Sequence, residues 1–186
     1  MPTRREFLRA GGVALAGLAF PSTARVAVLR TSRATQDIEI HMRSDQLGAR
    51  VWFDPIGVYI EPGQTVRWIV SENVHTTSAY HPQNSNHSLR IPQDATPWDS
   101  GFLSPGEHFE LELMTQGAYD YYCMPHEEAG MVGRIIVGKP NGPGALPFDY
   151  YQGRPGTTNW RPVPPAAQKA FPSIERIMRE RIVRLK

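Results

Sequence analysis

Short runs of alternating or β-branched residues recur through the middle of this chain, and turn signals separate them. Six such runs cover residues 38–42, 58–60, 66–70, 109–113, 119–122 and 132–137. Proline and glycine mark the turns, at Glu61-Pro62-Gly63, Ser104-Pro105-Gly106 and Gln116-Gly117. Several short strands at this spacing are typical of an all-β sandwich or barrel. We therefore expect one all-β domain over residues 34–138.

A single cysteine among 186 residues limits the disulfides and metal sites that the chain can form. It excludes an intramolecular disulfide, a Cys-rich zinc site, a four-thiolate iron–sulfur cluster and a dinuclear copper centre with two bridging cysteines. Residues 34–138 carry five Arg against fourteen acidic residues, whereas residues 139–186 carry nine basic residues against three acidic ones. An acidic domain is not expected to bind nucleic acid, because phosphate contacts need basic clusters. A basic partner surface is its natural electrostatic complement.

The first 24 residues have the pattern of a twin-arginine export signal. Arg4 and Arg5 precede an apolar run over residues 10–20, which is too short to span a bilayer as a helix, and Ala24 ends a small-residue cleavage site. The pattern predicts export to the periplasm or another space outside the cytoplasm. The alternatives are an uncleaved signal retained in the membrane and a basic start before a buried helix.

The composition changes after Gly138. Eight prolines fall within residues 140–172, which predicts an extension without a packed core of its own. Residues 173–186 then have the pattern of a short basic amphipathic helix capped by Ser173. We expect this helix to dock on its own domain, because short helices need a packing partner to be stable. Contact with a membrane surface or a partner protein is the alternative.

Three soft or borderline metal ligands lie on one loop between two predicted strands. Cys123, His126 and Met131 follow the spacing C-x2-H-x4-M, and His75 lies upstream at a strand end. One thiolate, two imidazoles and a thioether form the donor set of a His2Cys copper site with an axial Met. The sequence therefore predicts one type 1 copper ion, held by residues of a rigid β scaffold.

Residues 50–138 resemble the cupredoxins of the plastocyanin and pseudoazurin family, including halocyanin-like members. The matching motifs are Glu61 to Trp68, His75, Trp98 to Gly101, Ser104 to Gly106, Gly117 to His126, and Ala129 to Met131. The resemblance implies a Greek-key β-sandwich in which His75, Cys123, His126 and Met131 bind the copper. Pro125, which lacks an N–H and cannot donate to the thiolate, also matches.

Two features depart from the family pattern. Thr76 follows the first His ligand, at a position where the family usually has Asn. In the family this Asn ties the two ligand loops together. We expect the Thr76 hydroxyl or Asn73 to take over that role. The segment over residues 77–97 is long and polar. The remaining histidines, His41, His81, His87 and His108, are expected to be solvated or structural, with a second copper site at His81 and His87 as a weaker alternative. Trp52, Trp68, Trp98 and the tyrosines of residues 119–122 are expected in the core or near the site.

These features together predict an exported protein that carries single electrons between redox partners and turns over no substrate itself. Glu127 and Glu128 follow His126 and are expected to orient a basic partner. The alternatives are a copper-binding accessory protein for delivery, storage or sensing, and a copper subunit of a larger redox complex. A metal-free binding module conflicts with the complete ligand set.

Overall fold

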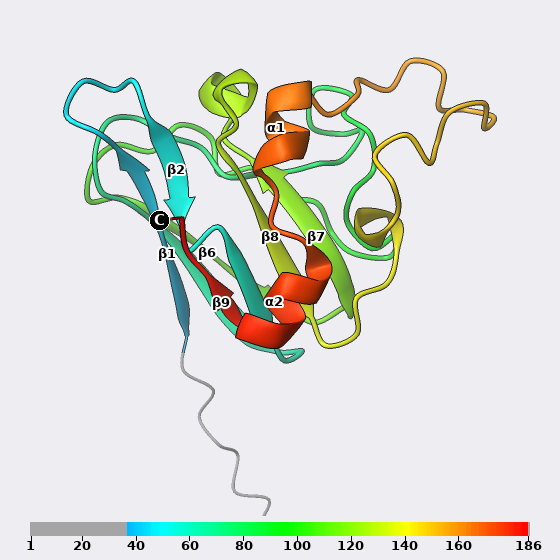
Figure 1. Ribbon diagram of the computed structural model, residues 1–186, viewed down its shortest axis with the longest axis horizontal. Coiled ribbons are helices and arrows are strands. Elements are labelled where there is room, and N and C mark those ends of the chain that lie inside the picture. Colours follow the sequence, from blue (N-terminus) through cyan, green and yellow to red (C-terminus); the bar gives the residue numbers. More distant parts are fainter. Residues whose placement is uncertain (1–36, 186) are drawn as a thin grey trace, which may run out of the picture. The chain divides into compact units, whose positions relative to one another are not determined.

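The computed structural model describes residues 37–185, so the predicted signal over residues 1–24 lies outside the described part of the chain. Two sheets form the scaffold (Figure 1). The first has the order β2-β1-β4-β6, with strands β1 (Ile38–Ser44), β2 (Val51–Asp54), β4 (Gln64–Val70) and β6 (His108–Leu113). The second has the order β5-β7-β8-β3-β9, with β3 (Gly57–Ile60), β5 (Ser78–Ala79), β7 (Gly117–Tyr122), β8 (Val132–Val137) and β9 (Ile182–Val183).

Most connections between these strands cross from one sheet to the other, but β1–β2, β7–β8 and β8–β9 stay within one sheet. Strand β1 pairs parallel with β4 and antiparallel with β2, and β3 pairs parallel with β8. Parallel neighbours need such crossovers, because a tight hairpin joins only antiparallel strands. The predicted Greek-key β-sandwich is confirmed, and all six predicted strands are present. The short strands β2, β5 and β9 were not predicted.

The inner faces of the two sheets enclose one apolar core. Every second residue of β1 and β4 points inward, so that Ile40, Met42, Val66 and Trp68 are fully buried. This alternation follows from the two-residue period of a strand. Trp52 is an exception to the prediction that the tryptophans are core residues. It lies half-buried on the opposite face of β2, near the guanidinium groups of two arginines.

The C-terminal extension packs against the sandwich, and its buried apolar side chains lie in clusters with residues of the body. It contains η2 (Pro143–Ala145), α1 (Pro165–Ala170) and α2 (Ile174–Glu180). The body supplies the partners that the extension lacks: Val163 and Ala167 are buried with Tyr80, Tyr122 and Val132. A proline-rich segment can therefore bury apolar side chains when a neighbouring sheet offers an apolar face.

The predicted C-terminal helix is shorter than expected. Ser173 caps α2 by accepting a hydrogen bond from the Arg176 N–H at 3.1 Å, as predicted, but the helix ends at Glu180. Arg181 then adopts a left-handed conformation, and β9 pairs antiparallel with the edge of β3. This pairing satisfies backbone groups that an open edge would leave exposed.

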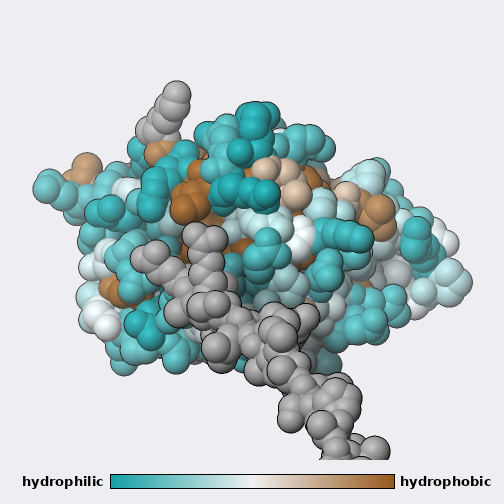
Figure 2. All heavy atoms as spheres, turned by 90° about the horizontal axis from the view of Figure 1, so that it is seen from below, coloured by the Kyte–Doolittle hydropathy of each residue, from teal (hydrophilic) through white to brown (hydrophobic). Residues whose placement is uncertain are grey.

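The apolar face of α2 is covered by the second sheet. Ile177 and Val183 are fully buried against Ile56, Ala118 and Ile136. Docking on the domain is therefore the arrangement that the structure shows. On the face in Figure 2, hydrophobic residues form small patches between hydrophilic ones. Among residues 37–185, no helix is both long and apolar enough to cross a membrane.

Candidate metal centre

Two chain segments meet at one end of the sandwich and bring the predicted ligands together. Cys123 directly follows β7, and the next residues form the short helix η1 (Met124–Ala129), which carries His126 and lies at the top of Figure 1. His75 comes from a segment that follows β4, where it forms an isolated antiparallel bridge with Leu103. The backbone N–H groups of His75 and Leu103 each donate to the other residue's carbonyl, at 3.1 and 2.9 Å.

Three donor atoms converge at this end of the fold. The Cys123 Sγ lies 3.3 Å from the His126 Nδ1 and 3.6 Å from the His75 Nδ1, and the two Nδ1 atoms are 3.2 Å apart. Within the described residues, these are the one group of three or more His, Cys, Asp or Glu side chains with ligand atoms within 4.8 Å of one another. A thiolate with two imidazoles suits copper, because it serves Cu(I) and Cu(II) alike.

The fourth predicted ligand, Met131, belongs to the same loop and is fully buried. Its backbone N–H donates to the His126 carbonyl at 3.1 Å, and its carbonyl accepts from the Cys123 N–H at 3.0 Å. The His126 N–H donates in turn to the Cys123 carbonyl at 3.0 Å. The three residues of the C-x2-H-x4-M pattern therefore form one closed hydrogen-bonded loop.

Thr76 links the two ligand segments. It is one of the two residues that were expected to take the place of the family's usual Asn. The Thr76 backbone N–H donates to the Cys123 Sγ at 3.3 Å, and the Thr76 hydroxyl accepts from the Met124 N–H at 2.7 Å. Asn73, the other substitute considered, is exposed. The threonine hydroxyl thus satisfies a backbone donor of the ligand loop and holds the two segments in a fixed relation.

Ser44 orients the His75 ring and was not predicted from the sequence. The Ser44 Oγ lies 3.1 Å from the His75 Nε2, and both residues are buried. Since the Nδ1 faces Cys123, the ring proton belongs on Nε2, which donates to the serine oxygen. No local motif reveals this contact, because Ser44 ends β1 and lies 31 positions before His75.

Burial keeps all three donors in their uncharged forms in the metal-free protein. It lowers the pKa of His75 to about 4, helped by the nearby His126, and it also lowers the pKa of His126. Burial raises the pKa of the Cys123 thiol to about 11, although hydrogen bonds from Thr76 act in the opposite direction. The imidazoles are therefore ready to ligate at neutral pH, while copper binding must displace the thiol proton.

We expect the copper-free protein to lose stability as the pH falls from 6.5 to 4. His75 and His87 are both buried, and burial lowers the pKa of each from 6.5 to about 4. In this window the unfolded chain binds more protons than the folded one, so stability rises with pH and is lost on acidification. Each histidine contributes up to roughly 3 kcal/mol. Urea unfolding at several pH values measures the slope.

A control variant separates these histidines from general acid effects. His108 is exposed, so His108→Gln is expected to leave the slope unchanged, whereas His87→Gln is expected to reduce it by about half. A stability that stays flat between pH 6.5 and 4 would contradict the assignment.

The other histidines do not form a second metal group in the described part of the chain. His87 is buried between the rings of Tyr80 and Tyr122, at centroid distances of 5.2 and 4.5 Å. His81 accepts a hydrogen bond from the Gln83 N–H at 3.1 Å. The weaker alternative of a copper site at His81 and His87 therefore finds no third donor among residues 37–185.

Glu127 lies inside the protein, which corrects its predicted role in partner binding. Its side chain is buried, and its carboxylate accepts a hydrogen bond from the Tyr80 hydroxyl at 2.7 Å. Glu128, the next residue, is exposed. A residue in a short helical turn points away from its neighbour, so only Glu128 can face a partner.

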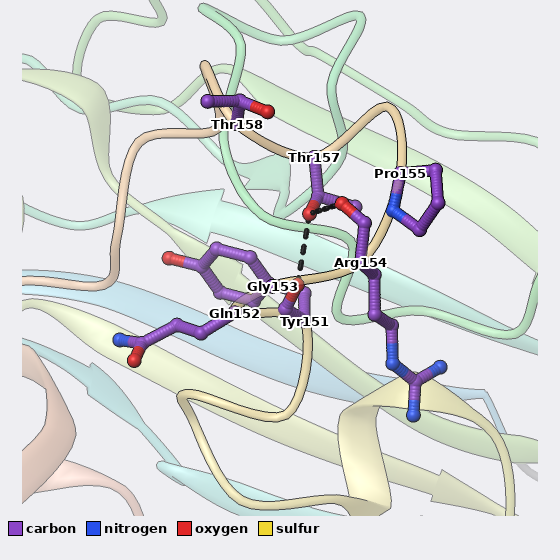
Figure 3. Close-up of a pocket in the computed structure, with 7 residues that line it drawn as sticks. All are labelled: Tyr151, Gln152, Gly153, Arg154, Pro155, Thr157 and Thr158. Atoms are coloured by element: carbon purple, nitrogen blue, oxygen red, sulfur yellow. Dashed lines mark hydrogen bonds between the residues drawn. The ribbon is translucent and has the colours of Figure 1, made fainter.

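The hollow shown in Figure 3 lies in the extension and not at the metal centre. Residues 151–155, 157 and 158 line a volume of about 470 Å³, and the Thr157 hydroxyl shares its proton between the carbonyls of Tyr151 and Arg154, both at 2.8 Å. These hydrogen bonds connect residues within one loop of the extension. None of the predicted ligands lines this hollow.

Comparison with known proteins agrees with the donor set. Residues 39–138 match the model of the copper binding proteins of the plastocyanin/azurin family. The chain belongs to this family. It is a cupredoxin with one type 1 copper ion, and so a copper protein of the electron-transfer class.

Individual relatives match over most of their length. A chloroplastic plastocyanin from Tetradesmus obliquus is 32% identical over 138 residues, which cover 69% of this chain and 79% of that protein. One from Chlamydomonas reinhardtii is 30% identical over 139 residues, which cover 70% of this chain and 86% of that protein. Among solved structures, a pseudoazurin from Sinorhizobium has 25% identity and a TM-score of 0.47, covering 57% of this chain and 76% of that one.

Proposed function

We propose that this cupredoxin is exported and carries single electrons between redox partner proteins, without turning over a substrate. His75, Cys123, His126 and Met131 would hold the copper ion, which supplies the one-electron couple Cu(II)/Cu(I). The observation that carries the proposal is the convergence of one Sγ and two Nδ1 atoms within 4.8 Å at a buried end of the β-sandwich.

The surroundings of these residues suit electron transfer. The ligand loop is closed by its own backbone hydrogen bonds and is tied to the His75 segment through Thr76. A ligand set held this firmly changes little between oxidation states, so electron transfer needs little reorganisation. Cys123 is fully buried, which excludes water from the thiolate and favours the less charged, reduced centre.

His126 is the route by which electrons reach the surface. It is half-buried, whereas the other three proposed ligands are fully buried. Apolar side chains that neighbour the ligands or their bridge partner in sequence are exposed: Met124 follows Cys123, Val74 precedes His75, and Phe102 precedes Leu103. A partner with an apolar patch can therefore exclude water at this end while the His126 ring edge is in reach.

Charge would orient the partner. Residues 34–138 are strongly acidic, and the exposed Glu128 stands two residues after His126. We expect Glu128→Gln to slow reduction of the copper by cationic hexaammineruthenium(II), with a weaker dependence on salt. Ferrocyanide, an anion, is expected to react faster with the same variant.

A matched control for Glu128 lies at the other end of the sandwich. Glu112 is exposed on β6 opposite Thr65, at the start of β4, whereas His75 follows the end of β4. Glu112→Gln therefore removes the same charge far from the proposed exit. Equal effects of the two variants, or none from either, would exclude local steering by Glu128.

Export rests on residues 1–24, outside the described structure. Replacing Arg4 and Arg5 by Lys in a fusion to a reporter is expected to stop export by the twin-arginine route. Unchanged export of the variant would exclude that route.

The spectrum of the copper-loaded full chain tests the function. One equivalent of Cu(II) is expected to produce an intense thiolate-to-copper absorption band and an EPR signal with narrow copper hyperfine splitting. Ascorbate should bleach the band, and air or ferricyanide should restore it. A pale, weak spectrum would instead indicate copper held by imidazoles alone and would favour delivery or storage of copper.

A further inference from the structure

The C-terminal extension contacts the loop that carries the proposed ligands. The family match ends at residue 138, but α1 of the extension lies beside η1 (Figure 1). Gly130 ends η1 in a left-handed conformation, with φ of 83°, and directly precedes Met131. A methyl group on Gly130 would lie 3.4 Å from the Ala166 carbonyl oxygen and 3.4 Å from the Ala170 Cβ. The helix therefore closes directly over the end of the ligand loop.

A buried polar cluster holds the same loop from beneath. Glu127 of η1 accepts from the Tyr80 hydroxyl at 2.7 Å, and its other carboxylate oxygen lies 3.5 Å from the His87 Nε2. All three side chains are nearly inaccessible to solvent. Neither His87 ring nitrogen has a hydrogen-bond partner, although Nε2 lies 3.5 Å from the Glu127 carboxylate. The bond from the Tyr80 hydroxyl therefore matters, because leaving a buried carboxylate unpaired is costly.

The extension also holds the segment that contains His87. His87 and Arg161 form a parallel bridge, in which the Ser88 N–H donates to the Arg161 carbonyl at 2.9 Å and the Arg161 N–H donates to the Asn86 carbonyl at 2.8 Å. Val163, Ala167 and Phe171 of the extension then pack on Tyr80 and Tyr122. The extension thus packs on Tyr80, Tyr80 donates to Glu127, and Glu127 directly follows His126 in the chain.

We propose that the extension is a clamp for the copper-ligand loop, with Tyr80 and Ala170 as positioning residues. This inference rests on the proposed function, since it assigns His126 and Met131 to the copper. Contact of α1 with Gly130 and the anchoring of Glu127 hold the loop at two points between these two ligands. The loop then keeps one conformation in both oxidation states, which keeps the barrier to electron exchange low.

Two substitutions weaken the clamp at different points. Tyr80→Phe keeps the buried ring and removes only the hydroxyl that donates to Glu127. Ala170→Leu adds bulk against Gly130 and pushes α1 off the loop. Each is expected to slow the electron self-exchange rate of the full-length copper protein about tenfold, the lower end of the usual effect for groups that support metal ligands. Each should also widen or shift the copper hyperfine splitting.

The copper-free protein offers a readout that does not depend on the metal. Hydrogen exchange of the Gly130 and Met131 amides, which donate to the Glu127 and His126 carbonyls, is expected to speed up at least about tenfold in both variants. Amides in the centre of β4 should exchange as in the parent protein, because the sandwich itself is unchanged.

Matched controls change residues of the extension without touching the loop. Tyr150→Phe deletes a hydroxyl that donates to the Leu89 carbonyl at 2.8 Å, and Lys169→Leu changes an exposed position of α1. Both should leave self-exchange and loop protection unchanged.

The outcomes separate this proposal from the function. If the parent protein lacks the thiolate-to-copper band, the proposed function fails, and exchange in the copper-free protein still decides whether the clamp exists. If the parent is blue but Tyr80→Phe and Ala170→Leu behave like the parent, the clamp is overturned. It is also overturned if the two controls change the loop as much as the two test variants do.

Discussion

Replacement of Cys123 by serine is expected to abolish the intense visible absorption of the copper-loaded protein and to lower its copper affinity at least about 100-fold. The band arises from charge transfer between a thiolate and Cu(II), and the chain has no other cysteine. A serine hydroxyl in the same buried place is a hard, neutral donor that suits Cu(I) poorly. Absorption and EPR spectra, with a competition titration against a Cu(I) chelator, measure both effects.

His81→Gln is the matched control for the loss of a metal-binding side chain. His81 lies outside the group formed by His75, Cys123 and His126, and its Nδ1 accepts a local hydrogen bond from the Gln83 N–H. The variant should keep the band and the parent affinity. A Cys123→Ser protein that stays blue, or a His81→Gln protein that loses its colour, would refute the proposed ligand set.

The metal centre could be predicted largely because its residues are close in sequence. Cys123, His126 and Met131 fall within nine positions, and the spacing alone limits which loop can hold them. The supporting groups are not local. Ser44 reaches His75 across 31 positions and Tyr80 reaches Glu127 across 47, and such pairs are set by how the sheets and loops pack. The exposure of Glu127 was mispredicted for the same reason.

The packing of the extension on the body could not be predicted, because composition describes only what a segment can do alone. Its prolines lack N–H donors, and its carbonyls therefore need partners from elsewhere. The body supplies them through Arg90, whose guanidinium donates to the carbonyls of Gly144, Leu146 and Pro147 at 2.9 to 3.1 Å. A buried arginine aimed at a later segment leaves no pattern in that segment's own residues.

A buried carboxylate makes this arrangement possible, so its removal is expected to have the largest effect on stability. Asp120 is fully buried in β7 and accepts hydrogen bonds from Arg90 and from Arg134, at distances between 2.6 and 3.0 Å. Arg134 also donates to the Pro172 carbonyl at 3.0 Å. One acidic group thus pairs with two cations, which bind the extension at residues 144–147 and at Pro172.

We expect Asp120→Asn to lower the free energy of unfolding by about 3 to 5 kcal/mol, the usual cost of leaving a buried charge without its partner. The amide keeps the size of the side chain but loses the charge, and its NH2 group faces donors instead of acceptors. Urea unfolding of the copper-free full chain measures the loss. Limited proteolysis should cut the extension faster, because both arginines that hold it are weakened.

An exposed ion pair provides the control for Asp120. Glu110 on β6 pairs with Arg67 at 2.8 Å, but both side chains are more than a third exposed. Glu110→Gln removes the same kind of charge and should cost less than about 1 kcal/mol, because water already screens the pair. Similar losses for the two variants would mean that burial does not strengthen the Asp120 contacts. The extension would then owe its position to its apolar contacts on Tyr80 and Tyr122.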